Sequence, residues 1–411
     1  MKAIIIAIGD EILIGQTTDT NSTFISGELN KIGVKVIEKR TIGDQKDIIK
    51  NTLHDCLQKA DIIITTGGLG PTSDDKTLES IAEYFHQKLL INQEILDFIT
   101  EKYVSRGLPL NKFNRRQALF PENAKVLWNY LGTAPGVYFH VNDKHVFLLP
   151  GVPAEMQQMM VQVIDHLSTL SDMAIIHQTV CTYGIPESVL AEMIQDWEKS
   201  LPEFLSLAYL PSFGEVKLRL SAFVNKNLSY DVKKSINQKI EELKHILKDK
   251  IYSLEDETIQ EVIGKILRNK KQTLSCAESC TGGYLSHLIT SIPGSSDYFM
   301  GSVVSYSNEV KMNVINVSEN SLKNYGAVSE VVAIEMAKGV KELNKTDYAL
   351  STTGIAGPGG ATPGKPVGTV WLACATPEKV VTKLLHLKGD RLTNIRRAAK
   401  LALFMLYEQI K

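Results

Sequence analysis

The first part of the chain alternates short apolar runs with longer stretches in which apolar residues recur every three or four positions. An apolar run of about four to eight residues is typical of a buried strand, and the longer repeat is typical of an amphipathic helix. The pattern predicts, in this order, a strand, a helix, a strand, a helix and a strand at residues 3–8, 21–32, 34–39, 46–59 and 61–65. Because such alternation needs crossover connections, it indicates a parallel sheet with ligands at the carboxyl ends of its strands.

A second α/β pattern occupies the C-terminal part of the chain. We expect strands at residues 273–277, 301–306, 348–352, 369–375 and 381–387. Helices are expected at residues 257–270, from about residue 281, and at residues 393–409.

The segment between these two patterns has a different arrangement of apolar and polar residues. In EVKLRLSAFV, apolar and polar residues alternate as in a half-exposed antiparallel strand, and a charged helical stretch covers residues 231–249. We therefore predict a multidomain α/β chain with an α/β domain at residues 1–170, a small α+β connecting domain at residues 171–254 and a second α/β domain at residues 255–411.

The composition narrows the class of protein. A chain of 411 residues, 44% hydrophobic and 22% charged, is long enough for two or three globular domains. Lys+Arg number 45 and Asp+Glu 46, so the charge of a nucleic-acid-binding protein is absent. The opening MKAIIIAIGD does not resemble a signal peptide, and no apolar run approaches the roughly 18 residues that cross a membrane. These features predict a cytoplasmic protein without membrane or nucleic-acid partners.

The cysteines favour reduced thiols. There are five, an odd number scattered along the chain. Cys276 and Cys280 are spaced C-x3-C with no matching pair nearby, so a zinc site is not expected.

A candidate nucleophile lies in SCAESCTGGYL. Here a predicted strand ends in a sharp turn, and Ser279 precedes a predicted helix. Free amides at a helix start can bind a phosphate or an oxyanion, and Gly282 and Gly283 let a substrate approach the backbone. The plainer alternative is that Ser279 or Thr281 only caps the helix, which contributes about 1 kcal/mol.

A candidate base lies in GSVVSYSNEVK. Tyr306 ends a predicted strand, Lys311 follows five residues later, and Thr353 ends another strand before a glycine-rich loop. A lysine whose pKa is lowered by burial, or a tyrosine beside it, can replace histidine as the base for a hydroxyl nucleophile. Taken singly, Tyr306 is more often a core residue with a satisfied hydroxyl, and Lys311 is more often a solvated helix residue.

The strings AESCTGGYL, YSNEVK, GAVSE and TTGIAGPGG, in this order, resemble the C-terminal domain of the CinA (competence/damage-inducible protein A) family over about residues 255–411. Members of that domain family are nicotinamide mononucleotide deamidases, which release ammonia and nicotinate mononucleotide. The resemblance implies a serine amidase without a cofactor, with Ser279 as the nucleophile. It further implies that Tyr306 and Lys311 activate the serine and that Thr353 positions the substrate or the oxyanion. The substrate-binding residues would be Thr281, Gly282, Gly283, Gly354 and Arg396, although an exposed structural role for Arg396 is the alternative.

The N-terminal half has its own candidate site in DIIITTGGLGPTSDDKT. Gly67, Gly68 and Gly70 let backbone amides face an anionic group, and Asp74 and Asp75 are adjacent carboxylates. Two carboxylates beside a pyrophosphate make sense if a divalent cation bridges them. The alternative is that Asp74 only stabilises the start of a helix.

The strings GDEILIGQTTDTNS, TTGGLGPTSDDKT, APGV and LPGVPAEM resemble the molybdopterin-binding, MoaB/MogA-like domain with which CinA proteins begin, a three-layer α/β domain. In that family the domain has been assigned an ADP-ribose pyrophosphatase activity that needs a divalent metal (Mg, Mn or Co) and potassium. The resemblance adds Thr72 to the substrate-binding residues and Asp10 and Glu11 to the metal ligands, with Asn21 and Glu155 in the same crevice. Pterin binding without catalysis is the alternative.

Together these features predict a bifunctional, homodimeric enzyme of pyridine nucleotide salvage, acting on nicotinamide mononucleotide and ADP-ribose. The dimer is implied by the family alone. Two alternatives remain: a protein of molybdenum cofactor synthesis, and a non-catalytic competence or DNA-damage factor.

Overall fold

The computed structural model describes the whole chain except residues 73, 74 and 106. The chain forms two compact units, residues 1–176 with 221–234, and residues 177–220 with 235–411. Within the described residues, no helix is both long and apolar enough to cross a membrane.

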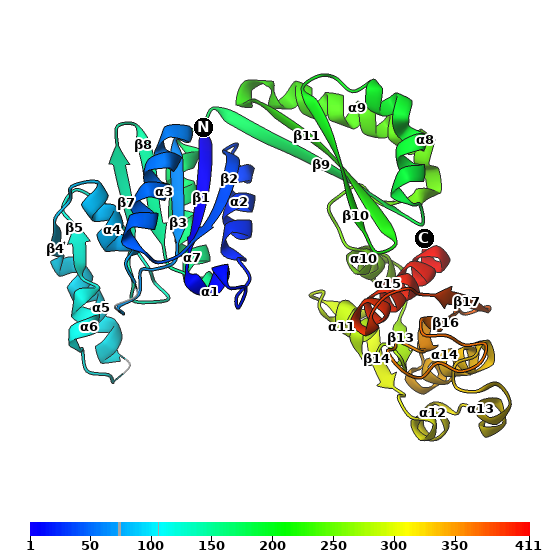
Figure 1. The fold of residues 1–411 in the computed structure, drawn as a ribbon. Helices are drawn as coiled ribbons and strands as arrows, with labels where there is room; N and C mark the ends of the chain where they lie inside the picture. The colour runs from blue at the N-terminus through cyan, green and yellow to red at the C-terminus, as the bar shows by residue number, and fades with distance from the viewer. Residues whose placement is uncertain (73–74, 106) are drawn as a thin grey trace. The chain divides into compact units, whose positions relative to one another are not determined.

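The first unit is built on a mixed sheet (Figure 1). The order of its strands is β2 (Lys35–Ile42), β1 (Lys2–Ile8), β3 (Ile62–Thr66), β8 (Lys144–Leu149), β7 (Gly136–Val141) and β6 (Lys125–Leu127). The first four run parallel, which confirms the predicted parallel sheet, and β7 and β6 add antiparallel strands at one edge.

Helices cover both faces of this sheet, so the three-layer α/β prediction is confirmed (Figure 1). Buried residues of α2 (Asn21–Lys31) and α7 (Pro153–Ser168) pack on one face, and those of α3 (Lys46–Lys59) and α4 (Thr77–Tyr84) pack on the other. An additional segment contains β4 (Leu89–Ile91), α5 (Gln93–Ser105), α6 (Lys112–Arg116) and β5 (Leu119–Pro121).

The connecting segment is α+β, as its pattern of apolar and polar residues predicted. Its sheet has the order β10 (Leu205–Ser212), β11 (Glu215–Asn225), β9 (Met173–Tyr183) and β12 (Ile251–Ser253). Two helices accompany it, α8 (Glu187–Lys199) and α9 (Ser229–Leu247), and the Trp197 indole of α8 donates to the Lys239 carbonyl of α9 at 2.9 Å.

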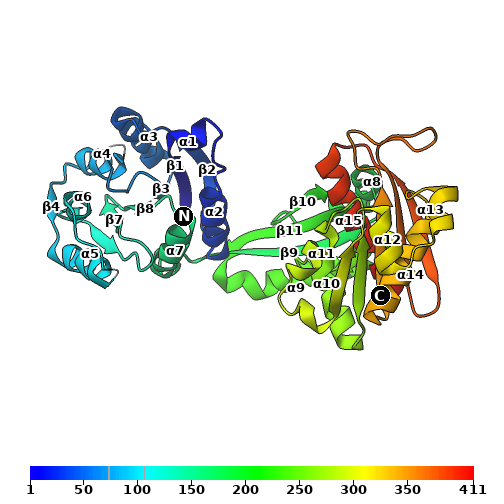
Figure 2. The same ribbon diagram turned by 90° about the horizontal axis from the view of Figure 1, so that it is seen from below.

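The C-terminal sheet has the order β14 (Phe299–Val304), β13 (Leu274–Glu278), β15 (Tyr348–Gly354), β16 (Thr369–Ala375) and β17 (Val380–His386). Strand β13 runs parallel to both of its neighbours, whereas β15, β16 and β17 pair antiparallel. The helices α10 (Ile259–Lys270), α11 (Tyr284–Thr290) and α15 (Arg391–Ile410) contribute to the core on one face. On the other face lie α12 (Asn308–Ile315), α13 (Glu319–Tyr325) and α14 (Glu330–Asn344) (Figure 2).

Helix α11 begins at Tyr284, three residues later than predicted. Gly282 and Gly283 have φ of 59° and 100°, in the left-handed region that a right-handed helix excludes. The two glycines therefore form a turn before the helix instead of its first turn.

Helix α15 also packs against the connecting segment. The Tyr183 ring stacks on Phe404 with centroids 5.2 Å apart, and the Tyr183 hydroxyl donates to Glu408. Tyr183 and Tyr252 belong to the same buried cluster as the C-terminal strands and helices. Residues at one end of the connecting segment thus take part in the hydrophobic core of the C-terminal domain.

Candidate functional sites

Ser279 lies directly after β13, at the carboxyl end of the C-terminal sheet. Its N–H donates to the Thr352 carbonyl of β15 at 2.9 Å, so the parallel neighbour fixes its backbone. Its side chain is half-buried and lines a cavity of about 240 Å³.

Lys311 is the group in contact with this serine. It belongs to α12, and its side chain is only 1% exposed. Its Nζ lies 3.1 Å from Ser279 Oγ and donates to the carbonyl oxygens of Ser305 at 2.6 Å and Tyr306 at 3.3 Å.

Burial lowers the pKa of Lys311 to about 8, because a buried ammonium loses its hydration. The amine is therefore partly neutral near physiological pH. A neutral amine has two N–H groups, which match the carbonyls of Ser305 and Tyr306, and one lone pair, which then faces Ser279 Oγ. This arrangement suits a general base for the hydroxyl.

The cavity brings together five residues predicted from the sequence. Tyr306 and Gly354 also line it, and so does Thr353, whose buried hydroxyl donates to the Ala327 carbonyl at 2.7 Å. No carboxylate is among the described residues that line the cavity. The full lining is Ser279, Cys280, Tyr306, Asn308, Lys311, Ala327, Val328, Thr353, Gly354, Ala356 and Arg391.

The tyrosine contacts an arginine that sequence reasoning missed. Tyr306 is 61% exposed, and its hydroxyl accepts from Arg391 Nη2 at 2.9 Å. Arg391 Nη1 donates to the Gly357 carbonyl at 2.7 Å. Arg396, the cation named from the sequence, is exposed further along α15 and does not line the cavity.

Three other predicted residues lie outside the cavity lining. Thr281 is 2% exposed, and its hydroxyl is hydrogen-bonded to the Thr352 hydroxyl at 2.6 Å. Gly282 N–H donates to the Ser279 carbonyl, and Gly283 N–H donates to the Glu278 carboxylate. These contacts leave neither glycine amide free for a substrate.

Cys280 follows the serine and lines the same cavity. Burial raises the pKa of its thiol to about 12, so the thiol stays protonated and is a poor nucleophile. Of the two adjacent side chains, Ser279 is the one equipped to attack.

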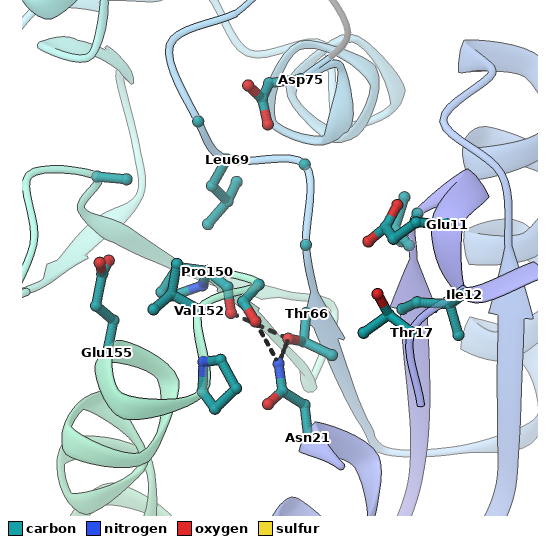
Figure 3. A pocket seen from close by; sticks show the side chains of 18 of the residues that line it. Glu11, Ile12, Thr17, Asn21, Thr66, Leu69, Asp75, Pro150, Val152 and Glu155 are labelled. Carbon is teal, nitrogen blue, oxygen red and sulfur yellow. Dashed lines mark hydrogen bonds between the residues drawn. The ribbon is translucent and has the colours of Figure 1, made fainter. Parts of the chain in front are cut away.

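A larger cavity, of about 470 Å³, lies at the carboxyl ends of β1, β3 and β8 in the first unit (Figure 3). Gly67 and Gly68 in its wall have φ of 108° and 66°. A Cβ on Gly67 would stand 2.1 Å from the Ile8 carbonyl oxygen, and one on Gly68 would stand 2.1 Å from Thr77 Oγ1. Only glycine fits this turn. Gly70 also lines the cavity.

Asn21 connects three parts of this wall. Its Nδ2 donates to Thr66 Oγ1 at 2.9 Å and to the Gly151 carbonyl at 2.8 Å, and Thr66 Oγ1 donates to the Pro150 carbonyl at 3.0 Å (Figure 3). Glu155 lines the cavity from α7.

Five carboxylates line the cavity: Glu11, Asp19, Asp44, Asp75 and Glu155. Sequence reasoning missed Asp19 and Asp44. Burial raises the pKa of Asp44, and the nearby charges of Asp10, Glu11 and Asp75 raise it further. The backbone N–H of Asp10 donates to Asp44 Oδ2 at 3.3 Å, but Asp10 itself is outside the lining.

Asp75 is held by Thr72, whose N–H and hydroxyl both donate to Asp75 Oδ2, at 3.0 and 2.5 Å. Thr72 lines a smaller adjacent pocket. Asp74 lies outside the described residues. Within the part of the chain that is described, no three Asp, Glu, His or Cys side chains form a metal-binding group.

Comparisons with known proteins match the chain along its length. Residues 256–410 match the family model "CinA C-terminal domain", residues 177–253 match "Damage-inducible protein CinA KH domain", and residues 4–169 match "Probable molybdopterin binding domain". Among solved structures, a CinA superfamily protein from Escherichia coli is 34% identical, with a TM-score of 0.36, and covers 37% of this chain and 88% of its own.

Two curated relatives match over almost their whole length. A CinA-like protein of Flavobacterium psychrophilum is 46% identical over 417 residues, covering 100% of this chain and 99% of its own. A CinA-like protein of Cytophaga hutchinsonii is 43% identical over 409 residues, covering 99% and 97%. The chain belongs to the CinA family.

Proposed function

We propose that the C-terminal domain is a serine amidase that hydrolyses the carboxamide of nicotinamide mononucleotide. The observation that carries this proposal is the hydrogen bond between Ser279 Oγ and the buried, pKa-lowered amine of Lys311. The substrate comes from the family resemblance, and a cavity whose described lining has no carboxylate is compatible with its phosphate.

In the proposed reaction, neutral Lys311 takes the proton of Ser279 Oγ as the oxygen attacks the carboxamide carbon. The carbon–nitrogen bond then breaks, and Lys311 returns the proton to the leaving nitrogen, which departs as ammonia. Water attacks the resulting ester, gives a proton to Lys311 and releases nicotinate mononucleotide as Ser279 Oγ is reprotonated. No external oxidant or reductant is needed.

The oxyanion of the tetrahedral intermediate needs a hydrogen-bond donor. The N–H groups of Ser279, Gly282 and Gly283 are already used within the protein. The N–H of Cys280, the residue after the nucleophile and part of the cavity wall, is therefore the proposed donor.

The test is ammonia release from nicotinamide mononucleotide by the purified protein, with and without a chelator. We expect release that resists the chelator, disappears in Ser279→Ala and persists in Ser296→Ala, a control on an exposed serine of the same domain. Absence of release from the unaltered protein would overturn the proposal.

For the N-terminal cavity we propose metal-dependent cleavage of the pyrophosphate of ADP-ribose. Its size, its glycine turn and its carboxylates favour this over a purely structural role. Carboxylate oxygens suit Mg²⁺ or Mn²⁺, and such ions are commonly held by one or two carboxylates together with substrate phosphates. Glu11 and Asp75 would hold the ion, which would neutralise phosphate charge when bound.

Potassium is a further proposed cofactor of this activity. The test is cleavage of ADP-ribose with each divalent metal, with and without potassium.

Two other functions have support in the family matches. Residues 4–169 match a molybdopterin-binding model, so pterin binding without cleavage is the competitor for the N-terminal cavity. Residues 177–253 match a KH model, but Gly184 and Gly214 are their only glycines, and they lack the Gly-x-x-Gly loop with which KH domains clamp nucleic acid. Strong retention of the protein on heparin at moderate salt would support nucleic-acid binding.

Homodimerisation, also proposed from the family, is tested by light scattering during size-exclusion chromatography.

A further inference from the structure

The residue before the nucleophile carries a completely buried carboxylate. Glu278 ends β13 and is 0% exposed. A carboxylate away from water is costly unless donors replace its hydration. The donors around Glu278 therefore indicate what the buried charge does.

Among the described residues, four donors reach this carboxylate, one from Gly283 just before α11 and three from the first turn of the helix. Oε2 accepts from the N–H groups of Gly283 and Leu285, both at 3.0 Å. Oε1 accepts from the N–H of Ser286 at 2.8 Å and from its hydroxyl at 2.5 Å. The first amides of a helix have no partner inside the helix, and a negative charge there is favourable. Glu278 thus joins the end of the strand to the helix across the intervening turn.

The backbone of Glu278 extends these contacts toward the base. Its carbonyl accepts from the buried Ser305 hydroxyl at 3.4 Å, and the Ser305 carbonyl accepts from Lys311 Nζ at 2.6 Å. Ser279 therefore follows a residue that is anchored through its side chain to α11 and through its backbone to the segment that holds Lys311.

We propose that Glu278 is a positioning residue that holds Ser279 Oγ in line with the Lys311 amine. Its role in catalysis rests on the proposed amidase function. The turn that carries Ser279 is fixed at one end by the Ser279 N–H to Thr352 bond and at the other by the Glu278 carboxylate. Loss of the second anchor widens the range of distances between the two reacting groups, and a misplacement of about 1 Å can cost roughly 10²-fold in rate.

The test variant is Glu278→Gln, which keeps the size of the side chain but replaces one acceptor oxygen with an amide group that faces donors. We expect faster hydrogen exchange in residues 279–286 and a kcat lowered by roughly 10²-fold with little change in KM. The pH dependence should stay that of the parent, because the contacts of Lys311 remain. Glu342→Gln, on an exposed residue of α14, is the control expected to change neither measurement.

Ser286→Ala provides a milder variant if Glu278→Gln does not fold. It removes one of the four bonds, so a smaller increase in exchange and a smaller fall in kcat are expected. Parent-like exchange in residues 279–286, or raised exchange with an unchanged kcat, would overturn the inference.

Failure of the proposed function gives a different result. If the parent protein releases no ammonia, kcat cannot be measured. Two other quantities then test the inference: the hydrogen exchange of residues 279–286 and the rate at which a fluorophosphonate modifies Ser279. Parent-like exchange, or an unchanged rate of modification in Glu278→Gln, then overturns the inference. Faster exchange together with slower modification supports it.

Discussion

The amine of Lys311 lies 3.1 Å from Ser279 Oγ, although 32 residues separate the two in the sequence. The sheet brings them together, because Ser279 follows β13 and Lys311 lies on the helix that follows β14, its parallel neighbour. Chain segments that follow neighbouring parallel strands emerge at the same edge of a sheet.

The first prediction concerns Lys311→Met, which keeps an unbranched side chain as far as Cε but has no amine. We expect ammonia release to fall by roughly 10³-fold, because Ser279 loses its base. Initial rates of ammonia release check this effect, and a variant with the rate of the parent would exclude Lys311 as the base.

The second prediction is the pH dependence. Lys311 acts as a base only when neutral, so kcat/KM should rise with pH through about 8 and level off above it. The unfolded chain binds this proton more tightly than the folded chain, so the contribution of Lys311 to stability rises between pH 8 and 10.5. Initial rates and denaturation curves across this range measure both, and an activity that falls through pH 8 would exclude a neutral-lysine base.

The third prediction separates two arginines of α15. Arg391 lines the cavity, whereas Arg396 is exposed outside it. We assign the substrate phosphate to Arg391, so Arg391→Ala should raise KM by roughly 10- to 100-fold, as expected for the loss of a hydrogen bond between charged groups, with a smaller effect on kcat. Arg396→Ala is the matched control, and equal effects of the two changes would contradict this assignment.

The fourth prediction concerns the independence of the two cavities. Asp75→Asn keeps an oxygen that can accept from Thr72 but removes the charge, so it should abolish metal-dependent cleavage of ADP-ribose and leave ammonia release unchanged. Loss of both activities would contradict the assignment of one activity to each domain.

Much of the architecture follows from local patterns in the sequence, but part of the site does not. The main strands and helices show clear periods, whereas β4, β5 and β6 are three residues long and show none. Ser279 and Lys311 could be predicted because they follow neighbouring parallel strands, whose carboxyl ends meet at one edge of the sheet. The role of Glu278 could not be predicted, since only the fold shows the N–H groups and the hydroxyl that donate to this buried carboxylate. Arg391 begins a helix, where a positive charge is disfavoured by the helix dipole, and sequence reasoning chose Arg396.

The packing of Tyr183 and Tyr252 against α15 has a consequence for unfolding. Because Tyr183 and Tyr252 of the connecting segment are buried in the core of the C-terminal domain, unfolding of either part exposes apolar surface of the other. They should therefore melt as one cooperative unit, and calorimetry of the whole chain should resolve two heat-absorption peaks where three sequence-defined domains would suggest three.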